Sequence, residues 1–199
     1  MFKVGITGGI GSGKTMVCKI FEVLGVPVYY ADFHAKRLME TDPGIRQELV
    51  RFFGPSVVSN GKINREKLAQ IIFNDRDALN SVNNIVHPAV RKDFIAWESR
   101  MTEHDYIIEE AAILFESGAY KLLNFNIAVS APEELRISRV MARDNVSREA
   151  VLRRISNQMT EQERIKLADD IILNDESELL IPQILSLHKK LIEEGKNKI

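Results

Sequence analysis

Residues 8–15 decide the fold, and they read Gly8-Gly9-Ile10-Gly11-Ser12-Gly13-Lys14-Thr15. They match the phosphate-binding loop pattern G-x-x-x-x-G-K-[S/T]. Residues 1–7 form a short apolar run typical of a buried strand, and residues 16–24 place their apolar side chains on one helical face. Strand, glycine loop and helix are the order that this pattern requires. The stretch therefore predicts an α/β fold built around a nucleoside triphosphate site.

Each residue type in the loop has a physical role. Glycine lets the backbone curl so that successive N–H groups point at a phosphate, and the following helix directs its positive end at the same point. The ammonium of Lys14 can reach the outer phosphates, and the hydroxyl of Thr15 can bind Mg²⁺. The loop indicates a nucleotide such as ATP, and it leaves the reaction open.

Composition limits the class of protein. The chain has 199 residues, of which 45% are hydrophobic, enough for one large domain with a full core. Its net charge of −1 gives no basic field for nucleic acid. No apolar run approaches the roughly 18 residues of a membrane span, and the first residues lack a signal-peptide layout. The single cysteine, Cys18, suits a small core residue. We therefore expect an intracellular protein with neither a membrane segment nor a nucleic acid partner.

Two acidic side chains follow predicted strands. Asp32 comes after a strand at residues 25–30, and Glu110 lies near the end of a buried strand at residues 105–110. In open parallel sheets ligands bind beyond the carboxyl ends of the strands. Asp32 could there accept a proton from an attacking hydroxyl, bind Mg²⁺ through water, or simply cap the next helix. Glu110 is a candidate Mg²⁺ partner, whereas Glu109 points to the other face of the sheet; ordinary strand-end polarity is the alternative.

The segment from residue 64 to residue 101 reads mostly as helix. Before it, Gly54-Pro55 ends an earlier helix and Asn60-Gly61 signals a tight turn. His87-Pro88 is expected to break the run, because proline pushes the preceding residue out of helical conformation. This much helix between two strands exceeds a simple crossover, so we expect a helical subdomain inserted on the ligand side of the sheet.

The last third combines two strands, at residues 125–130 and 168–174, with an arginine-rich stretch and a closing helix at residues 178–194. Residues 195–199 are expected to form a frayed tail. The stretch from residue 136 to residue 154 holds six arginines and no lysine: Arg136, Arg139, Arg143, Arg148, Arg153 and Arg154. Guanidinium groups suit phosphate oxygens. We expect one or two of them to contact phosphate and the others to pair with neighbouring glutamates.

Taken together, the motifs make the chain similar to the dephospho-coenzyme A kinase family over nearly its whole length. The elements that carry the resemblance are residues 5–15, Tyr30-Ala31-Asp32, Ile85-Val86-His87-Pro88, residues 112–116, residues 139–144, residues 154–158 and residues 168–174. Each element alone is weak, and their order and spacing together are specific. The chain departs from the family at Ala112, where proline is usual, at Ile113 for leucine, at Glu110 for aspartate, and at Met16.

The resemblance implies transfer of the ATP γ-phosphoryl group to the ribose 3′-hydroxyl of dephospho-coenzyme A, with Mg²⁺. It implies a three-layer P-loop kinase-like fold with a five-stranded parallel sheet flanked by helices. The single domain would comprise a core (1–59, 102–138 and 164–199), a helical acceptor-binding region (60–101) and a lid (139–163).

By position, the resemblance also assigns roles. Asp32 would be the base, with Lys14 and Arg139 as the other catalytic residues. The nucleotide would be held by Gly8, Gly11, Ser12, Gly13, Lys14, Thr15, Met16, Arg143 and Asn174. The acceptor would meet Asp32, His87, Leu114, Phe115 and Glu116. The metal would be held by Thr15 and Glu110.

Two alternatives remain from the sequence. Another small-molecule or nucleoside monophosphate kinase would share the loop and the arginines. A small GTPase-like switch would share the loop, but it needs an N-K-x-D element, and residues 174–176 are the nearest approach and do not fit.

Overall fold

The computed structural model describes residues 1–73 and 75–197. The chain forms two compact units, one comprising Met1–Tyr30 with Arg100–Ile199 and the other comprising Ala31–Ser99. Within the described residues, none of the helices is both long enough and apolar enough to span a bilayer.

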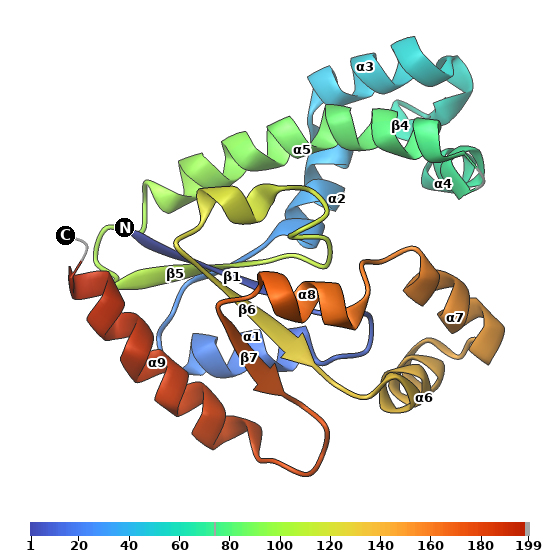
Figure 1. Cartoon of the computed structure of the whole chain (residues 1–199). Coiled ribbons are helices and arrows are strands. Elements are labelled where there is room, and N and C mark those ends of the chain that lie inside the picture. Colours follow the sequence, from blue (N-terminus) through green and yellow to red (C-terminus); the bar gives the residue numbers. More distant parts are fainter. Residues whose placement is uncertain (74, 198–199) are drawn as a thin grey trace. The chain divides into compact units, whose positions relative to one another are not determined.

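The larger unit contains a five-stranded sheet in the order β2-β5-β1-β6-β7, in which all pairings are parallel (Figure 1). The strands are β1 (Phe2–Thr7), β2 (Val28–Tyr30), β5 (Tyr106–Glu110), β6 (Phe125–Ser130) and β7 (Asp170–Leu173). Central strands are continuous apolar runs because helices cover both faces of a parallel sheet. The predicted five-stranded parallel sheet is confirmed.

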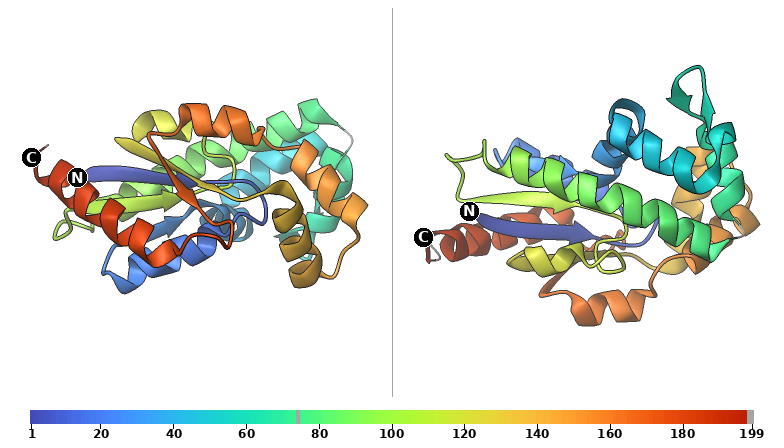
Figure 2. Two further views of the ribbon diagram at one scale, coloured as in Figure 1. Left: turned by 60° about the horizontal axis from the view of Figure 1, so that its bottom comes forward. Right: turned by 90° about the horizontal axis from the view of Figure 1, so that it is seen from above.

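Helices cover both faces of this sheet. The helices of the larger unit are α1 (Lys14–Val23), α6 (Glu133–Asp144), α7 (Arg148–Ser156), α8 (Glu161–Leu167) and α9 (Leu180–Asn197), with the short η2 (Ala119–Leu122). Helices α1 and α9 lie on one face of the sheet and α8 lies on the other (Figure 2). The core between the sheet, α1 and α9 includes the fully buried Cys18, as expected from the sequence. The unit therefore has the predicted three layers.

Strand register brings the ends of three strands together. Ile6 of β1 is paired with Glu110 of β5, and Glu110 is paired with Tyr30 of β2. The glycine loop follows β1 directly, so it leaves the sheet at the edge where β5 and β2 also end. This is the ligand-binding edge of a doubly wound sheet.

The closing helix is longer than expected. The sequence predicts a frayed tail from residue 195, but α9 continues to Asn197; of this tail, Lys198 and Ile199 lie outside the described residues. Gly195 is buried, and a Cβ atom there would lie 2.5 Å from the carbonyl oxygen of Asp105. This close packing holds the last turn, whereas glycine near a chain end usually indicates fraying.

The smaller unit is mainly helical. It contains α2 (Ala31–Thr41), α3 (Pro43–Phe53), η1 (Pro55–Val57), β3 (Val58–Ser59), β4 (Lys62–Ile63), α4 (Arg65–Phe73) and α5 (Arg76–Glu98). Helices α2, α3 and α4 pack on α5 around a core of their own. The unit therefore takes in residues 31–59 as well as most of the predicted helical region.

Local signals in this unit behave as predicted. Gly54, with φ of 79°, ends α3. Asn60 and Gly61 have φ of 52° and 73° and join the antiparallel strands β3 and β4. Two successive positive φ angles define the hairpin turn for which Asn-Gly is the favoured pair.

The prediction that His87-Pro88 breaks the helix is wrong. Pro88 lies inside α5, which continues from Arg76 to Glu98. Val82 and Val86 before the proline and Phe94 after it are all buried. Packing on both sides of Pro88 outweighs the hydrogen bond that proline removes.

Candidate phosphate-binding site

The glycine loop has the backbone that its sequence predicts. Gly11 and Gly13 have φ of 81° and 93°, a region that costs other residues energy. A Cβ atom on Gly11 would also lie 2.5 Å from the carbonyl oxygen of Arg136. Gly13 caps α1 without a side-chain hydrogen bond, so no side chain caps the start of the helix, which is the end of a helix that favours phosphate.

The polar side chains of the loop lie as a nucleotide site requires. Lys14 donates from Nζ to the carbonyl oxygen of Gly8 at 2.7 Å, which folds its ammonium over the loop. The hydroxyl of Ser12 is buried and has no hydrogen-bond partner among the described residues. Thr15 and Met16 are exposed at the start of α1. An orphan hydroxyl beside uncapped N–H groups fits a loop that a phosphate completes.

Asn174 connects this loop to the arginine-rich helix. Its side-chain Nδ2 donates to the backbone carbonyl oxygen of Ser12 at 2.8 Å, and its backbone carbonyl oxygen accepts from Nη1 of Arg139 at 3.0 Å. Nη2 of Arg139 donates to Glu176, also at 3.0 Å. The structure thus brings Asn174 to the phosphate loop and Arg139, predicted from a separate motif, to Asn174.

Arg143, which is also expected to bind the nucleotide, pairs with an aspartate of its own helix. Its side chain is 64% exposed and makes two hydrogen bonds to Asp144, at 2.7 and 3.1 Å. Arg154 also donates to Asp144, at 2.8 Å. These hydrogen bonds, that from Arg143 first, lower the pKa of Asp144 to about 2. In this structure Arg143 is therefore part of an ion-pair network between α6 and α7.

The two residues expected to hold a magnesium ion are Thr15 and Glu110. Thr15 is the second residue of α1, and Glu110 is buried at the end of β5. Burial first, and then the Glu110 carboxylate, raise the pKa of the Cys18 thiol, which places this carboxylate near α1. Within residues 1–73 and 75–197, no three acidic, imidazole or thiol groups gather into a self-contained metal site. The residues fit Mg²⁺, because this ion needs only one or two protein oxygens when phosphate and water supply the others.

The segment after β5 packs against the core and against the turn before α8. Leu114 is fully buried, with its side chain beside Gly5. The rings of Phe115 and Tyr120 meet edge to face, with centroids 5.3 Å apart. Glu116 accepts a hydrogen bond from the N–H of Met159 at 3.0 Å. Leu114 thus packs this segment against β1, and Glu116 binds the segment to the turn before α8.

The remaining predicted residues belong to the smaller unit. Asp32 is exposed in the first turn of α2, which begins at Ala31, so the alternative of a helix N-cap is wrong. His87 is half-buried on α5, and burial lowers its pKa.

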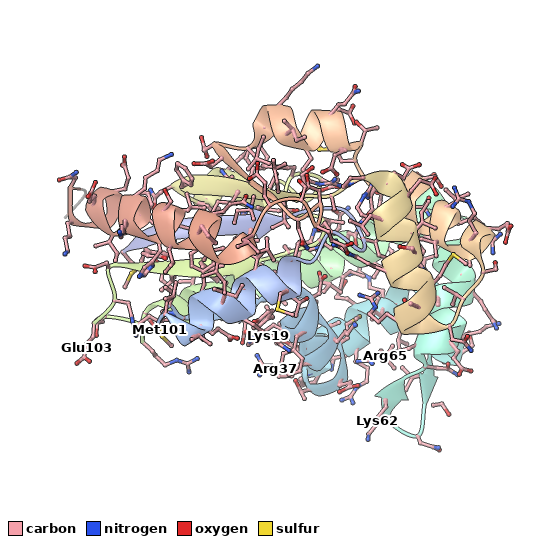
Figure 3. All side chains as sticks on the ribbon, turned by 90° about the horizontal axis from the view of Figure 1, so that it is seen from below. Lys19, Arg37, Lys62, Arg65, Met101 and Glu103 are labelled. Carbon is pink, nitrogen blue, oxygen red and sulfur yellow. The ribbon has the colours of Figure 1, made fainter. Side chains whose placement is uncertain are left out.

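Sequence reasoning missed several residues. In the smaller unit, Asp93 binds both His34, at 2.9 Å, and Arg37, at 2.7 Å, and Arg65 binds Glu40 at 2.7 Å (Arg37 and Arg65 are labelled in Figure 3).

In the larger unit, Gln158 accepts from the N–H of Ile10 at 2.9 Å, and Arg164 is 1% exposed. The capping box of Thr160 and Glu163 signals the start of α8. No pattern in the sequence indicates that its arginine is buried.

A parallel sheet whose first strand leads through a phosphate loop into a helix, with arginines following a later strand, defines a P-loop kinase-like protein. A family model described as dephospho-CoA kinase matches residues 2–179. The chain therefore belongs to the dephospho-CoA kinase family, and it is a kinase of coenzyme A biosynthesis. The alternatives of another small-molecule kinase and of a GTPase-like switch are set aside.

Individual relatives agree. A dephospho-CoA kinase of Bacteroides fragilis is 45% identical over 185 residues, which cover 93% of this chain and 90% of that relative. A solved structure of a Thermus thermophilus protein has a TM-score of 0.83 at 36% identity and covers 97% of each chain. The structure of dephospho-CoA kinase from Campylobacter jejuni has a TM-score of 0.66 at 28% identity, covering 99% of this chain and 98% of that one.

Proposed function

We propose that this chain transfers the γ-phosphoryl group of ATP to the ribose 3′-hydroxyl of dephospho-coenzyme A. The observation that carries the proposal is the phosphate loop joined through Asn174 to Arg139. Loop N–H groups, the start of α1 and Lys14 offer donors and positive charge to the triphosphate. Arg139 brings a second cation from another helix to the same site. Phosphoryl transfer relies on such positioning and charge stabilisation rather than on covalent chemistry.

The proposed roles follow from where each group lies. Lys14 and Arg139 offset the charge that develops on the transferring group, and Arg143 joins them when it exchanges Asp144 for phosphate. Thr15 and Glu110 would hold Mg²⁺, which would neutralise part of the charge of the phosphates. Asp32 orients the ribose hydroxyl and accepts its proton. Its place in the first turn after β2 supports this role, because the carboxyl ends of the strands form the ligand edge.

We propose that the acceptor binds to the helical region 60–101 together with residues after β5. His87, Phe115 and Glu116 are the acceptor-side residues, with Leu114 packed beneath them. Residues 139–163 act as a lid that closes over the ATP bound to the core part of the domain (1–59, 102–138 and 164–199) and excludes water from the site. The resemblance to the family supports this division. We propose a cytoplasmic location, and the buried thiol of Cys18 suits such a reducing compartment. We propose neither a membrane nor a nucleic acid partner.

Replacing Asp32 tests the proposed base. Asp32→Asn keeps the size of the side chain and removes the proton acceptor, so we expect kcat to fall by about 10²- to 10⁴-fold while ATP binding is retained. Glu193→Gln is the control, because Glu193 is an exposed acidic residue of α9, outside the proposed acceptor region and lid. Near-normal turnover of Asp32→Asn, measured by coupled ADP release, would remove Asp32 from the mechanism.

A further inference from the structure

Two buried guanidinium groups converge on the phosphate loop from different helices. Arg136 on α6 is 4% exposed and Arg164 on α8 is 1% exposed. A Cβ atom built on Gly9 would collide with Nη1 of Arg136 and would lie 3.6 Å from Nη1 of Arg164. Gly9 is the second residue of the loop. Both cations therefore lie beside the part of the chain whose sequence predicts phosphate binding.

Their hydrogen bonding is incomplete. Across the part of the chain that the structure describes, the Nε of Arg136 and the Nε of Arg164 are both buried without a hydrogen-bond partner. Arginines that serve only to hold a fold have their donors satisfied when they are buried. An orphan N–H on each of two adjacent guanidinium groups indicates that a further acceptor belongs there.

The charge of Arg136 is also only weakly matched by the protein. The carboxylate nearest Arg136 is that of Glu133, which is 56% exposed and lies 3.7 Å away. Arg164 has Glu161 at 3.1 Å and Glu116 at 3.9 Å, and Glu116 also binds Met159. Two like charges buried together repel each other, and an anion between them removes this cost.

Arg164 is held in place by the turn before its helix. Its Nη2 donates to the carbonyl oxygen of Met159 at 2.8 Å, and the adjacent Gln158 accepts from the N–H of Ile10. The turn and the loop are thus joined directly, and the guanidinium cannot move far from Gly9. A donor fixed before the ligand arrives needs little reorganisation when charge develops.

We propose that Arg136 and Arg164 form a guanidinium pair that binds oxygens of the terminal phosphoryl group of a nucleoside triphosphate. This inference rests on the proposed function, because it takes ATP as the donor. The pair is separate from Lys14 and from Arg139, which approach the loop at Gly8 and through Asn174. Its occupant is a phosphate dianion, since forked donors from two helices match several oxygens on one group.

The test compares nucleotides that differ only in their phosphates. Dissociation constants of ATP, ADP and AMP are measured by calorimetry with Mg²⁺ for wild type, Arg136→Met and Arg164→Met. We expect each variant to weaken ATP binding at least tenfold more than ADP binding and to leave AMP unchanged. Arg51→Met, whose side chain is 77% exposed on α3 and lies outside the proposed lid, is the control and should match wild type for all three nucleotides.

A structural role would give a different result. If the arginines only support the loop, ATP and ADP would weaken equally, because the loop holds the β-phosphate of both. That outcome overturns the inference and leaves the proposed function intact. Failure of the wild-type protein to bind ATP overturns both, whereas ATP binding without phosphorylation of dephospho-coenzyme A overturns only the proposed function.

A second measurement uses the wild-type protein, so it does not depend on whether Arg136→Met and Arg164→Met fold. The Nε–H signals of the two arginines are followed by NMR in the wild-type protein, with Arg136→Lys and Arg164→Lys used for assignment. We expect Mg·ATP to shift both signals and AMP to shift neither. Signals that do not respond to Mg·ATP contradict the proposal.

Discussion

Asn174→Ala removes the hydrogen bond that ties β7 to the phosphate loop. The bond runs from Nδ2 of Asn174 to the carbonyl oxygen of Ser12, at 2.8 Å, and Ser12 is fully buried. A buried carbonyl that loses its partner costs about 1–3 kcal/mol. The backbone carbonyl of Asn174 remains available to Arg139, so the change is confined to the loop.

The cost should appear in both nucleotide affinity and stability. If the loop must regain its bound conformation when ATP enters, the ATP dissociation constant rises by about fivefold to 150-fold, at 1.4 kcal/mol for each factor of ten. The melting temperature falls by about 2–4 °C per kcal/mol for a chain of this size. Calorimetric titration with Mg·ATP and thermal unfolding measure the two effects.

Asn124→Ala provides the matched control. Asn124 also makes one side-chain to backbone hydrogen bond, accepting from the N–H of Lys3 at 2.8 Å, at the end of β1 away from the loop. This variant should lose a little stability and bind ATP as wild type does. Wild-type ATP affinity in Asn174→Ala, or an equal loss in both variants, would refute the idea that Asn174 organises the loop.

Three other perturbations have definite expected results. Gly195→Ala places a Cβ atom 2.5 Å from the carbonyl oxygen of Asp105, so it should lower the free energy of unfolding by about 1–3 kcal/mol in urea titration; unchanged stability would mean that α9 ends earlier. Burial lowers the pKa of His188 below its usual 6.5, beside the Tyr106 hydroxyl at 2.6 Å. The unfolded chain then binds more protons, so stability should fall as pH drops below 6.5, with a shallower slope in His188→Gln. Val151→Ala should lower the melting temperature, because Val151 is fully buried in the small core between α6 and α7, and no change would show that this core is loose.

Local chemistry explains which parts of the fold could be predicted. The glycine loop, the Asn60-Gly61 turn and the apolar strands depend on neighbouring residues, and the structure has them as the sequence indicates. Pro88 could not be placed correctly, because a helix that is packed on both sides of a proline tolerates it. The expectation of a frayed tail from Gly195 failed for the same reason, because the packing of Gly195 depends on Asp105 from a distant part of the chain.

The candidate site divides in the same way. Lys14 and Thr15 follow from one motif, and the resemblance predicts Asn174 and Arg139. Asn174, which follows β7, contacts the loop, and Arg139 of α6 contacts Asn174. The burial of Arg164 could not be predicted, because arginine is usually exposed. Only tertiary contacts show that α8 directs this side chain to Gly9.

The central claim is that the acceptor is dephospho-coenzyme A. The most direct test is coupled ADP release with Mg·ATP, adding dephospho-coenzyme A, AMP, CMP, pantothenate or water alone in turn. We predict rapid turnover with dephospho-coenzyme A only, and a product phosphorylated at the ribose 3′-hydroxyl. Faster turnover with another acceptor, or slow hydrolysis without preference for any acceptor, would contradict the account.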